Sequence, residues 1–222
     1  MRELQWGLWH WTAPHPEWTP AERWPREVSS YAMDDGTRLV LFDPLSVPDE
    51  LLELAGERSP IVVLTAPWHE RDTESLVTRL GAVPVFVPPP DTPEDLVRKF
   101  GIPLEQAGRG SPDVAWLLAS DRGPDRAHLY AAGDELPLGI EALRGREHND
   151  LVLWIESRRA VLTGDTLVDF GKGLQVNDWL RGGVTRKEVV ERLRPLLNRP
   201  VELVLPAHGE PTNLTALVRA LA

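Results

Sequence analysis

The sequence predicts an α/β fold of four layers, an αββα sandwich in which two packed β-sheets are flanked by helices. Strand-rich and helical stretches alternate in two similar halves of the 222-residue chain, without a repeat or a flexible linker between them. Several of the strand runs are continuously apolar, which is typical of strands buried on both faces. Two sheets covered by helices suit this pattern better than one parallel sheet does. We therefore expect a single domain over residues 1–222.

Residues 1–30 form a segment rich in tryptophan and proline. Five of the nine tryptophans lie there, and the prolines between them forbid a long helix. We expect an early strand followed by an irregular segment packed on the domain. Large aromatic side chains usually cover the edge of a core, which is the reading we favour. The alternative is that they form the wall of a pocket for an apolar or aromatic ligand.

The pattern becomes regular from residue 31. The run 31–44 reads as a strand, an Asp-Gly turn and a second strand that ends in Asp43-Pro44. Further elements follow in order: a helix over 48–57, a buried strand over 61–64, a helix over 71–80, a short strand over 83–88 and a helix over 93–101. The last of these helices has proline in its first turn and glycine at its end.

The second half begins with a loop-rich stretch, 105–126, around the apolar piece 113–120. A β-rich region follows, with strand patterns over 127–133, 137–145, 150–157 and 159–164. The tail returns to α/β, with an amphipathic helix over 185–197, a strand over 201–206 and a last helix over 213–222.

Composition excludes several classes of protein and site. The chain has no cysteine, so disulfides and thiolate metal ligands are excluded. Its formal net charge of -10 argues against nucleic acid and anionic membranes as partners. No stretch approaches the ~20 apolar residues of a membrane span, and the N-terminus lacks the apolar core of a signal peptide. We expect a cytoplasmic protein with a small-molecule substrate or ligand; its oligomeric state is not indicated.

Polar residues gather in four turns that follow predicted strands. These are 66–72, with His69, Glu70 and Arg71; 146–150, with His148; 165–167, with Asp165; and 207–210, with His208. Side chains at strand ends converge on one edge of a sheet, where sites in layered α/β folds are built. Imidazoles and carboxylates together suit zinc, iron or manganese.

This order of elements resembles the metallo-β-lactamase superfamily from about Tyr31 to Ala222. AVLTGDTL is similar to the family's strand that ends in a metal-bridging aspartate, which implies that role for Asp165. LVLPAHGEPT is similar to its late strand and Pro-x-His-Gly turn, which implies a ligand at His208. GREHNDLVLWIE is similar to the segment that carries a histidine before a strand pair, His148, and LVLFDP to the strand that ends in a supporting aspartate, Asp43.

The chain departs from the family at its main motif. The family's Thr-His-x-His-x-Asp-His supplies four ligands, whereas this chain has Thr65-Ala66-Pro67-Trp68-His69-Glu70-Arg71. The first metal site keeps only His148 and is expected to be empty, since one imidazole does not hold zinc tightly. The second site keeps Glu70, Asp165 and His208.

Arg71 and His69 leave two arrangements open. In the first, the Arg71 guanidinium pairs with Asp165 and Glu70 and replaces the metal structurally. In the second, a register shift or a bend in the loop turns His69 inward, so that His69, Asp165 and His208 form a mononuclear site. Trp68 either fills the volume of the lost ligands, which we favour, or stacks against a flat substrate.

Two functions from different classes follow. The first is a hydrolase that cleaves an ester, thioester or lactone with one zinc, iron or manganese ion, held by Asp165, His208 and Glu70 or His69. Its catalytic residues would be Asp165, His148 and His69, and its substrate-binding residues Trp68, Arg71 and His148. The second is a non-catalytic protein without metal that binds a small molecule or a partner protein. We favour the hydrolase, which rests on the resemblance, whereas the lost ligands favour the second. Glu147 and Asp150 are expected to be solvated.

Overall fold

The computed structural model describes residues 1–81, 83–109, 113–118 and 127–222. The expected loop-rich stretch 105–126 lies partly outside these residues. Two short helices lie in its described part or overlap its start, α4 (Leu104–Ala107) and α5 (Ala115–Leu118).

Strands of the first half form one seven-stranded mixed sheet, with β1 to β7 side by side in chain order. Its strands are β1 (Arg2–Gln5), β2 (Leu8–Pro14), β3 (Glu27–Asp34), β4 (Arg38–Phe42), β5 (Ser59–Val63), β6 (Val85–Val87) and β7 (Ala127–Leu129). β1 to β4 are antiparallel, whereas β4 to β7 are parallel. The segment 1–14 thus contributes two strands, β1 at the edge and β2 next to it, where one early strand was expected.

The second sheet has five strands in the order β14-β11-β10-β9-β8. They are β8 (Glu135–Leu136), β9 (Ile140–Arg144), β10 (Leu151–Ile155), β11 (Ala160–Gly164) and β14 (Leu203–Pro206), while β12 (Leu167–Val168) and β13 (Gln175–Val176) pair separately. β11 and β14 run parallel, with β11 also antiparallel to β10.

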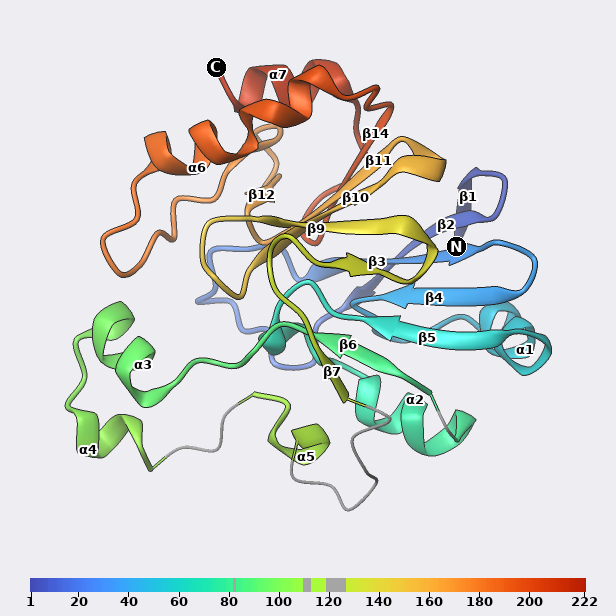
Figure 1. Cartoon of the computed structure of the whole chain (residues 1–222), viewed down its shortest axis with the longest axis horizontal. Helices are drawn as coiled ribbons and strands as arrows, with labels where there is room; N and C mark the ends of the chain where they lie inside the picture. The colour runs from blue at the N-terminus through green and yellow to red at the C-terminus, as the bar shows by residue number, and fades with distance from the viewer. Residues whose placement is uncertain (82, 110–112, 119–126) are drawn as a thin grey trace.

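Three apolar clusters define the layers. The central cluster joins the facing sides of the two sheets, with Tyr31, Val40 and Phe42 from one and Leu151 and Leu153 from the other. The outer side of the first sheet packs on α1 (Asp49–Glu57), α2 (Thr73–Leu80) and α5. The outer side of the second packs on α6 (Arg186–Leu193) and α7 (Leu214–Ala220). Figure 1 shows these helices on opposite sides of the two sheets, as the αββα prediction requires.

Local chemistry explains where several elements begin and end. The turn between β3 and β4 is closed by Asp34 and Asp35, whose carboxylates accept from backbone N–H groups of residues 36–38. Helix α3 (Pro93–Phe100) starts with a Thr92–Asp95 capping box and ends at Gly101 in the left-handed conformation. α6 starts with a second capping box, Thr185–Glu188.

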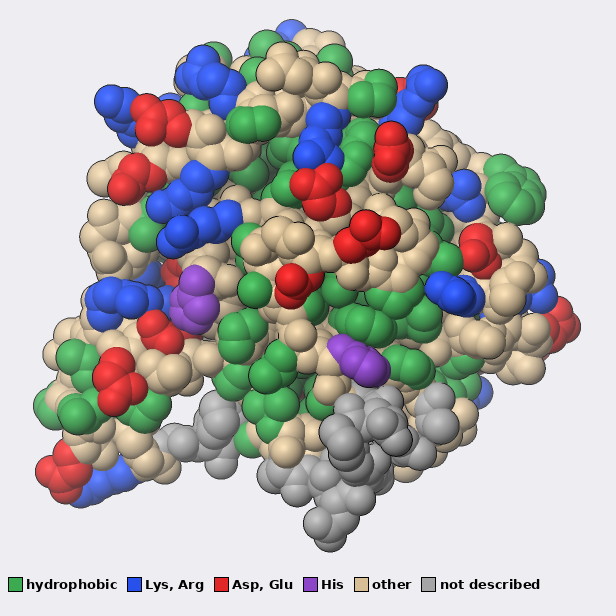
Figure 2. Space-filling view, in the orientation of Figure 1, with side chains coloured by type: hydrophobic (Ala, Val, Ile, Leu, Met, Phe, Trp, Pro, Cys, Tyr) green, Lys and Arg blue, Asp and Glu red, His purple; other side chains and the backbone are tan. Residues whose placement is uncertain are grey.

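The surface of the face in Figure 2 carries acidic and basic side chains interspersed. That face therefore presents no continuous area of one charge sign. Among the described residues, no helix is both long and apolar enough to cross a membrane.

Candidate metal site

Parallel strand ends place the polar turns of both sheets at one edge. Asp43 follows β4, and the short 3₁₀ turn Pro67–His69 follows β5. In the second sheet, Asp165 follows β11 and His208 lies just beyond β14. These segments are far apart in sequence, and the fold alone brings their side chains together.

Two imidazoles converge on one carboxylate oxygen. The Nε2 atoms of His69 and His208 each lie 3.3 Å from Oδ1 of Asp165. The three groups can offer ligand atoms that all lie within 4.8 Å of one another. Asp165 Oδ1 is buried and lacks a well-directed hydrogen-bond partner. A buried, unsatisfied oxygen between two imidazoles is the arrangement that a divalent ion completes.

A second layer of hydrogen bonds orients His69. Its Nδ1 atom lies 3.1 Å from Asp43 Oδ2 and 2.9 Å from Thr65 Oγ1. Asp43 itself accepts from the backbone N–H and the hydroxyl of Thr65, at 2.8 and 2.6 Å. A carboxylate behind a histidine is the usual support of a metal ligand, because it fixes the ring and leaves Nε2 for the ion.

Burial and charge shift the protonation of the three candidate ligands. Burial disfavours the charged imidazole of His69, but the carboxylates of Asp43 and Asp165 outweigh it and raise the pKa of His69 to about 9. Burial lowers the pKa of His208. Burial also opposes the charge on Asp165, yet the two imidazoles hold the pKa of Asp165 well below its usual range. The carboxylate is thus ionised at neutral pH.

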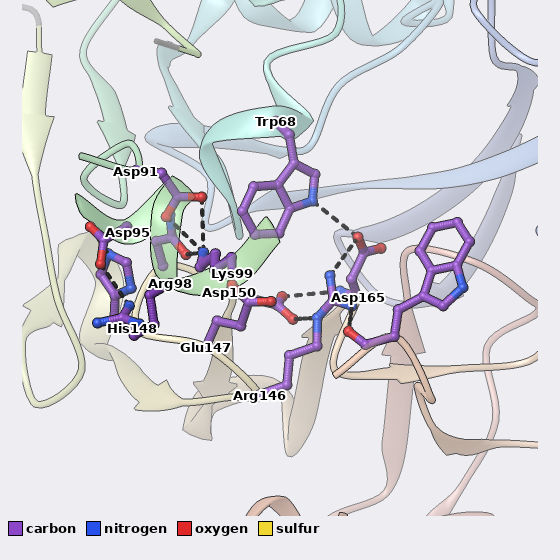
Figure 3. Close-up of polar contacts among 12 residues, drawn as sticks. Trp68, Asp91, Asp95, Arg98, Lys99, Arg146, Glu147, His148, Asp150 and Asp165 are labelled. Atoms are coloured by element: carbon purple, nitrogen blue, oxygen red, sulfur yellow. Dashed lines mark hydrogen bonds and ion pairs between the residues drawn. The ribbon is translucent and has the colours of Figure 1, made fainter. Parts of the chain in front are cut away.

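The other oxygen of Asp165 is occupied by two donors. The indole Nε1 of Trp68 donates to Oδ2 at 3.0 Å, and Nη2 of Arg146 donates to it at 3.3 Å. Figure 3 shows Arg146 extending between Asp150 and Asp165. Its Nε donates to Asp150 at 2.6 Å and its Nη1 to the carbonyl oxygen of Trp179 at 2.9 Å.

A buried lysine lies on the other side of Trp68 from Asp165 in Figure 3. Lys99, at the end of α3, donates to both carboxylate oxygens of Asp91, at 2.6 and 2.9 Å, and to Asn149 at 3.1 Å. It also pairs with Glu147. The expectation that Glu147 and Asp150 are solvated is wrong: they are 7% and 0% exposed, because Lys99 and Arg146 neutralise them inside the protein.

These groups line a cavity of about 460 Å³. His69, Asp165, His208, Arg71 and Arg146 form part of its wall. Much of the remaining lining is aromatic, contributed by Trp24, Trp68, Phe100, Phe170 and Trp179. The rings of Trp24 and Phe170 lie 5.1 and 5.7 Å from the His208 ring, in edge contacts.

The N-terminal tryptophans fill both roles that the sequence left open, covering the core and lining a pocket. Trp11 is buried in the core beside the first sheet, and Trp9 packs against the same cluster. Trp24 instead lies in the cavity wall, whereas Trp6 is 74% exposed.

Glu70 points away from the cavity. Its carboxylate accepts from the backbone N–H of Val114 at 2.8 Å and from the indole of Trp116 at 3.1 Å. The structure therefore does not bring Glu70 to the predicted ligand set, whereas it does bring His69 there.

His148 also lies outside the cavity. It is half-buried, 3.8 Å from Asp95, in a group with Asp91 and Asp95 whose potential ligand atoms lie within 4.8 Å of one another. Asp91 is already held by Lys99, and Asp95 caps α3 and pairs with Arg98. These contacts give that second group a structural explanation.

Arg71 does not reach Asp165. Its Nη1 donates to the carbonyl oxygens of Ser29 and Asp43, at 2.8 and 2.7 Å, and to the Ser30 hydroxyl at 3.2 Å. The guanidinium that pairs with Asp165 belongs to Arg146. Of the two arrangements left open by the sequence, the geometry matches the one with His69 turned inward by a bend in the loop.

Arg146 and Lys99 were not predicted from the sequence to be residues of the site. The turn that contains Arg146 was recognised as polar, but nothing in its spacing indicates that Arg146 rather than His148 points inward. Lys99 had a signal in principle, because it is one of only three lysines; in the structure it is buried at the end of α3.

Comparisons with known proteins agree on the fold. No family model matches the chain, and no curated protein matches it by sequence. Solved structures match over nearly the whole chain. The DIM-1 metallo-β-lactamase is 12% identical with a TM-score of 0.65, covering 99% of this chain and 93% of its own. A metallo-β-lactamase superfamily protein from Sulfolobus tokodaii, ST1585, is 16% identical with a TM-score of 0.63, covering 97% and 84%.

A third structure is closer in sequence. TTHA1623, solved in a di-iron-bound form, is 27% identical with a TM-score of 0.57, covering 88% of this chain and 94% of its own. The chain has the metallo-β-lactamase superfamily fold, and the αββα prediction and the resemblance stated from its motifs are confirmed at that level.

Proposed function

We propose that this protein is a metal-dependent hydrolase with a mononuclear site formed by His69, Asp165 and His208, acting on an ester, thioester or lactone. The observation that carries the proposal is the convergence of both imidazole Nε2 atoms on the buried, unsatisfied Oδ1 of Asp165. Two histidines and one carboxylate form a donor set suited to zinc, iron or manganese.

The charge balance around the cavity also favours one divalent ion. Hydrogen bonds and ion pairs join Asp43, His69, Asp165, Arg146 and Asp150 in one buried chain of contacts. The guanidinium of Arg71 lies beside them and donates to the backbone carbonyl oxygen of Asp43. A histidine that binds metal must be neutral, and with His69 and His208 neutral the three carboxylates exceed the two guanidinium cations by one negative charge. In the metal-free chain a proton on His69, whose pKa is raised to about 9, supplies that charge. Uncompensated buried charge is costly, and a divalent cation removes that cost.

When bound, such an ion lowers the pKa of a coordinated water and polarises a carbonyl oxygen. The chain's own residues supply the remaining requirements. Asp43 and Thr65 hold the His69 ring in one orientation. Trp24, Phe170 and Trp179 offer flat apolar walls for the acyl or leaving group of a substrate and reduce access of bulk water.

Turnover tests this proposal. The protein, purified without a metal-affinity tag and loaded with Zn²⁺, Mn²⁺ or Fe²⁺, is assayed on a panel of aryl esters, thioesters and lactones. We expect hydrolysis that requires the ion and is abolished by Asp165→Asn and by His208→Ala. His148→Ala is the matched control, because His148 lies outside the cavity, and it is expected to retain activity. Loss of activity in the control, or no turnover of any class, contradicts the proposal.

One observation favours a second candidate, a metal-free ligand-binding protein. Arg146 and Trp68 already donate to Asp165, which partly satisfies the carboxylate without an ion. This protein would use the aromatic cavity to hold a flat apolar molecule. A chain that binds no ion, but whose tryptophan fluorescence responds to such a ligand in a Trp68-dependent manner, would support this candidate over the hydrolase.

A further inference from the structure

The two oxygens of Asp165 have different surroundings. Oδ1 faces the two imidazoles and lacks a well-directed hydrogen bond. Oδ2 accepts from the Trp68 indole and from the Arg146 guanidinium. A carboxylate that bridges two metal ions needs a free lone pair on each side. In this site only the side toward the histidines is free.

Arg146 is fixed in place by its other contacts. It is 5% exposed, and its Nε donates at 2.6 Å to Asp150, which is fully buried. Its Nη1 donates to the Trp179 carbonyl oxygen, and the guanidinium lies 5.8 Å from the centre of the Trp68 ring. A guanidinium is always charged and cannot ligate a metal. A permanent positive charge therefore stands beside Asp165.

The neighbouring carboxylates already form ion pairs. Three carboxylates near Trp68 have cationic partners: Asp91 and Glu147 pair with Lys99, and Asp150 pairs with Arg146. No complete second ligand set is left among them.

We propose that Arg146 takes the place of a second metal ion. It blocks Oδ2 of Asp165, so the site binds one ion per chain, and it supplies a fixed positive charge to the negative oxygen that develops when water adds to the substrate carbonyl. Its five N–H groups make three hydrogen bonds to the described residues, which leaves donors in the cavity wall. This inference rests on the proposed metal site.

The number of metal ions bound per wild-type chain tests the first part of this proposal, namely that the site binds one ion. The metal-free chain is titrated with Mn²⁺ and followed by electron paramagnetic resonance, in which free, isolated and spin-coupled ions are distinguishable. We expect one isolated ion per chain, with further Mn²⁺ staying free in solution. Two coupled ions per chain would overturn this inference while leaving the metal site intact. No bound ion would overturn the inference and the proposed hydrolase together.

Variants test whether Arg146 sets this limit. In the variant Arg146→Gln, the guanidinium is removed and the carboxylates of Asp150 and Asp165 lose their cationic partner, so that both become available to a second ion. We expect this variant to bind a second Mn²⁺ ion, and its kcat, on whichever substrate is turned over, to fall on the order of 100-fold with a smaller change in KM. Arg146→Lys keeps the charge and is expected to bind one ion, like the wild type. A folded Arg146→Gln chain, checked by circular dichroism, that still saturates at one ion contradicts the role of Arg146.

Discussion

His10 shows how one buried side chain ties the first sheet to the site. Its Nε2 lies 2.9 Å from the Ser29 hydroxyl, which donates in turn to the carbonyl oxygen of Gly209, next to His208. Its ring stacks on Tyr31, and the residue is 4% exposed. Burial lowers the pKa of His10 from 6.5 to about 4. The native state thus keeps this histidine neutral where an unfolded chain would protonate it.

The pH dependence of the free energy of unfolding should reveal the lowered pKa of His10. Between pH 6.5 and 4 the unfolded chain takes up a proton at residue 10 that the native chain does not, so the free energy of unfolding should fall as pH decreases across that window. The lost contribution is at most about 3 kcal/mol. The measurement is urea unfolding of wild type and His10→Gln at several pH values. The difference between the two should shrink toward pH 4; a constant difference would show that His10 titrates normally.

Individual site residues were only partly predictable from the sequence. Asp165 and His208 follow strands directly, so strand direction alone places them. Glu70 and His148 lie in turns, where one bend decides which side chain faces inward. Arg71 has a positive φ of 43°, and the Pro67–His69 turn precedes it. Together these conformations direct His69 rather than Glu70 into the cavity, and no local pattern of residues encodes that choice.

The connection between β5 and α2 is the element on which the site depends most. Arg71 anchors it, since its guanidinium donates to the carbonyl oxygens of Ser29, near the start of β3, and of Asp43, just after β4. Hydrogen bonds from charged donors contribute about 1.5–3 kcal/mol each when their partners are buried. The left-handed backbone at Arg71 also costs energy that these bonds offset.

Removing this anchor should destabilise the protein. We expect Arg71→Ala to lower the free energy of unfolding by about 2–4 kcal/mol, because two buried carbonyl oxygens lose their donor. Urea unfolding at pH 7 measures the change. Arg79→Ala is the matched control: it removes an exposed arginine from α2, the next helix, and should change stability by less than about 0.5 kcal/mol. Similar effects of both substitutions would contradict the anchoring role.

Elements with strong local chemistry were predicted well. The 31–42 hairpin is marked by Asp-Gly, α3 by proline and glycine at its ends, and β5, β10 and β11 by continuous apolar runs. The short pair β12 and β13 was not anticipated, because two-residue strands carry no periodicity. The sequence also did not indicate that β7 belongs to the first sheet, because β7 pairs there with β6, from which a long connection separates it.

At the scale of the whole molecule, the site results from two sheets whose parallel strand ends share one edge. The alternation of strands and helices predicted this architecture, and the solved structures confirm it. The occupant of the cavity was not predictable, because it depends on which of several polar side chains face inward. Two buried cations, Arg146 and Lys99, pair with carboxylates at the cavity. Their positions result from the tertiary structure and are not indicated by a local sequence pattern.

The proposed hydrolase and the proposed role of Arg146 both require that one metal ion binds between His69, Asp165 and His208. The most direct test of this claim is metal content: the untagged protein is incubated with zinc, iron or manganese, dialysed against metal-free buffer and analysed by mass spectrometry. We predict about one ion per chain, lost in His208→Ala and retained in His148→Ala. A wild-type chain that retains no ion under any of these conditions would contradict the claim.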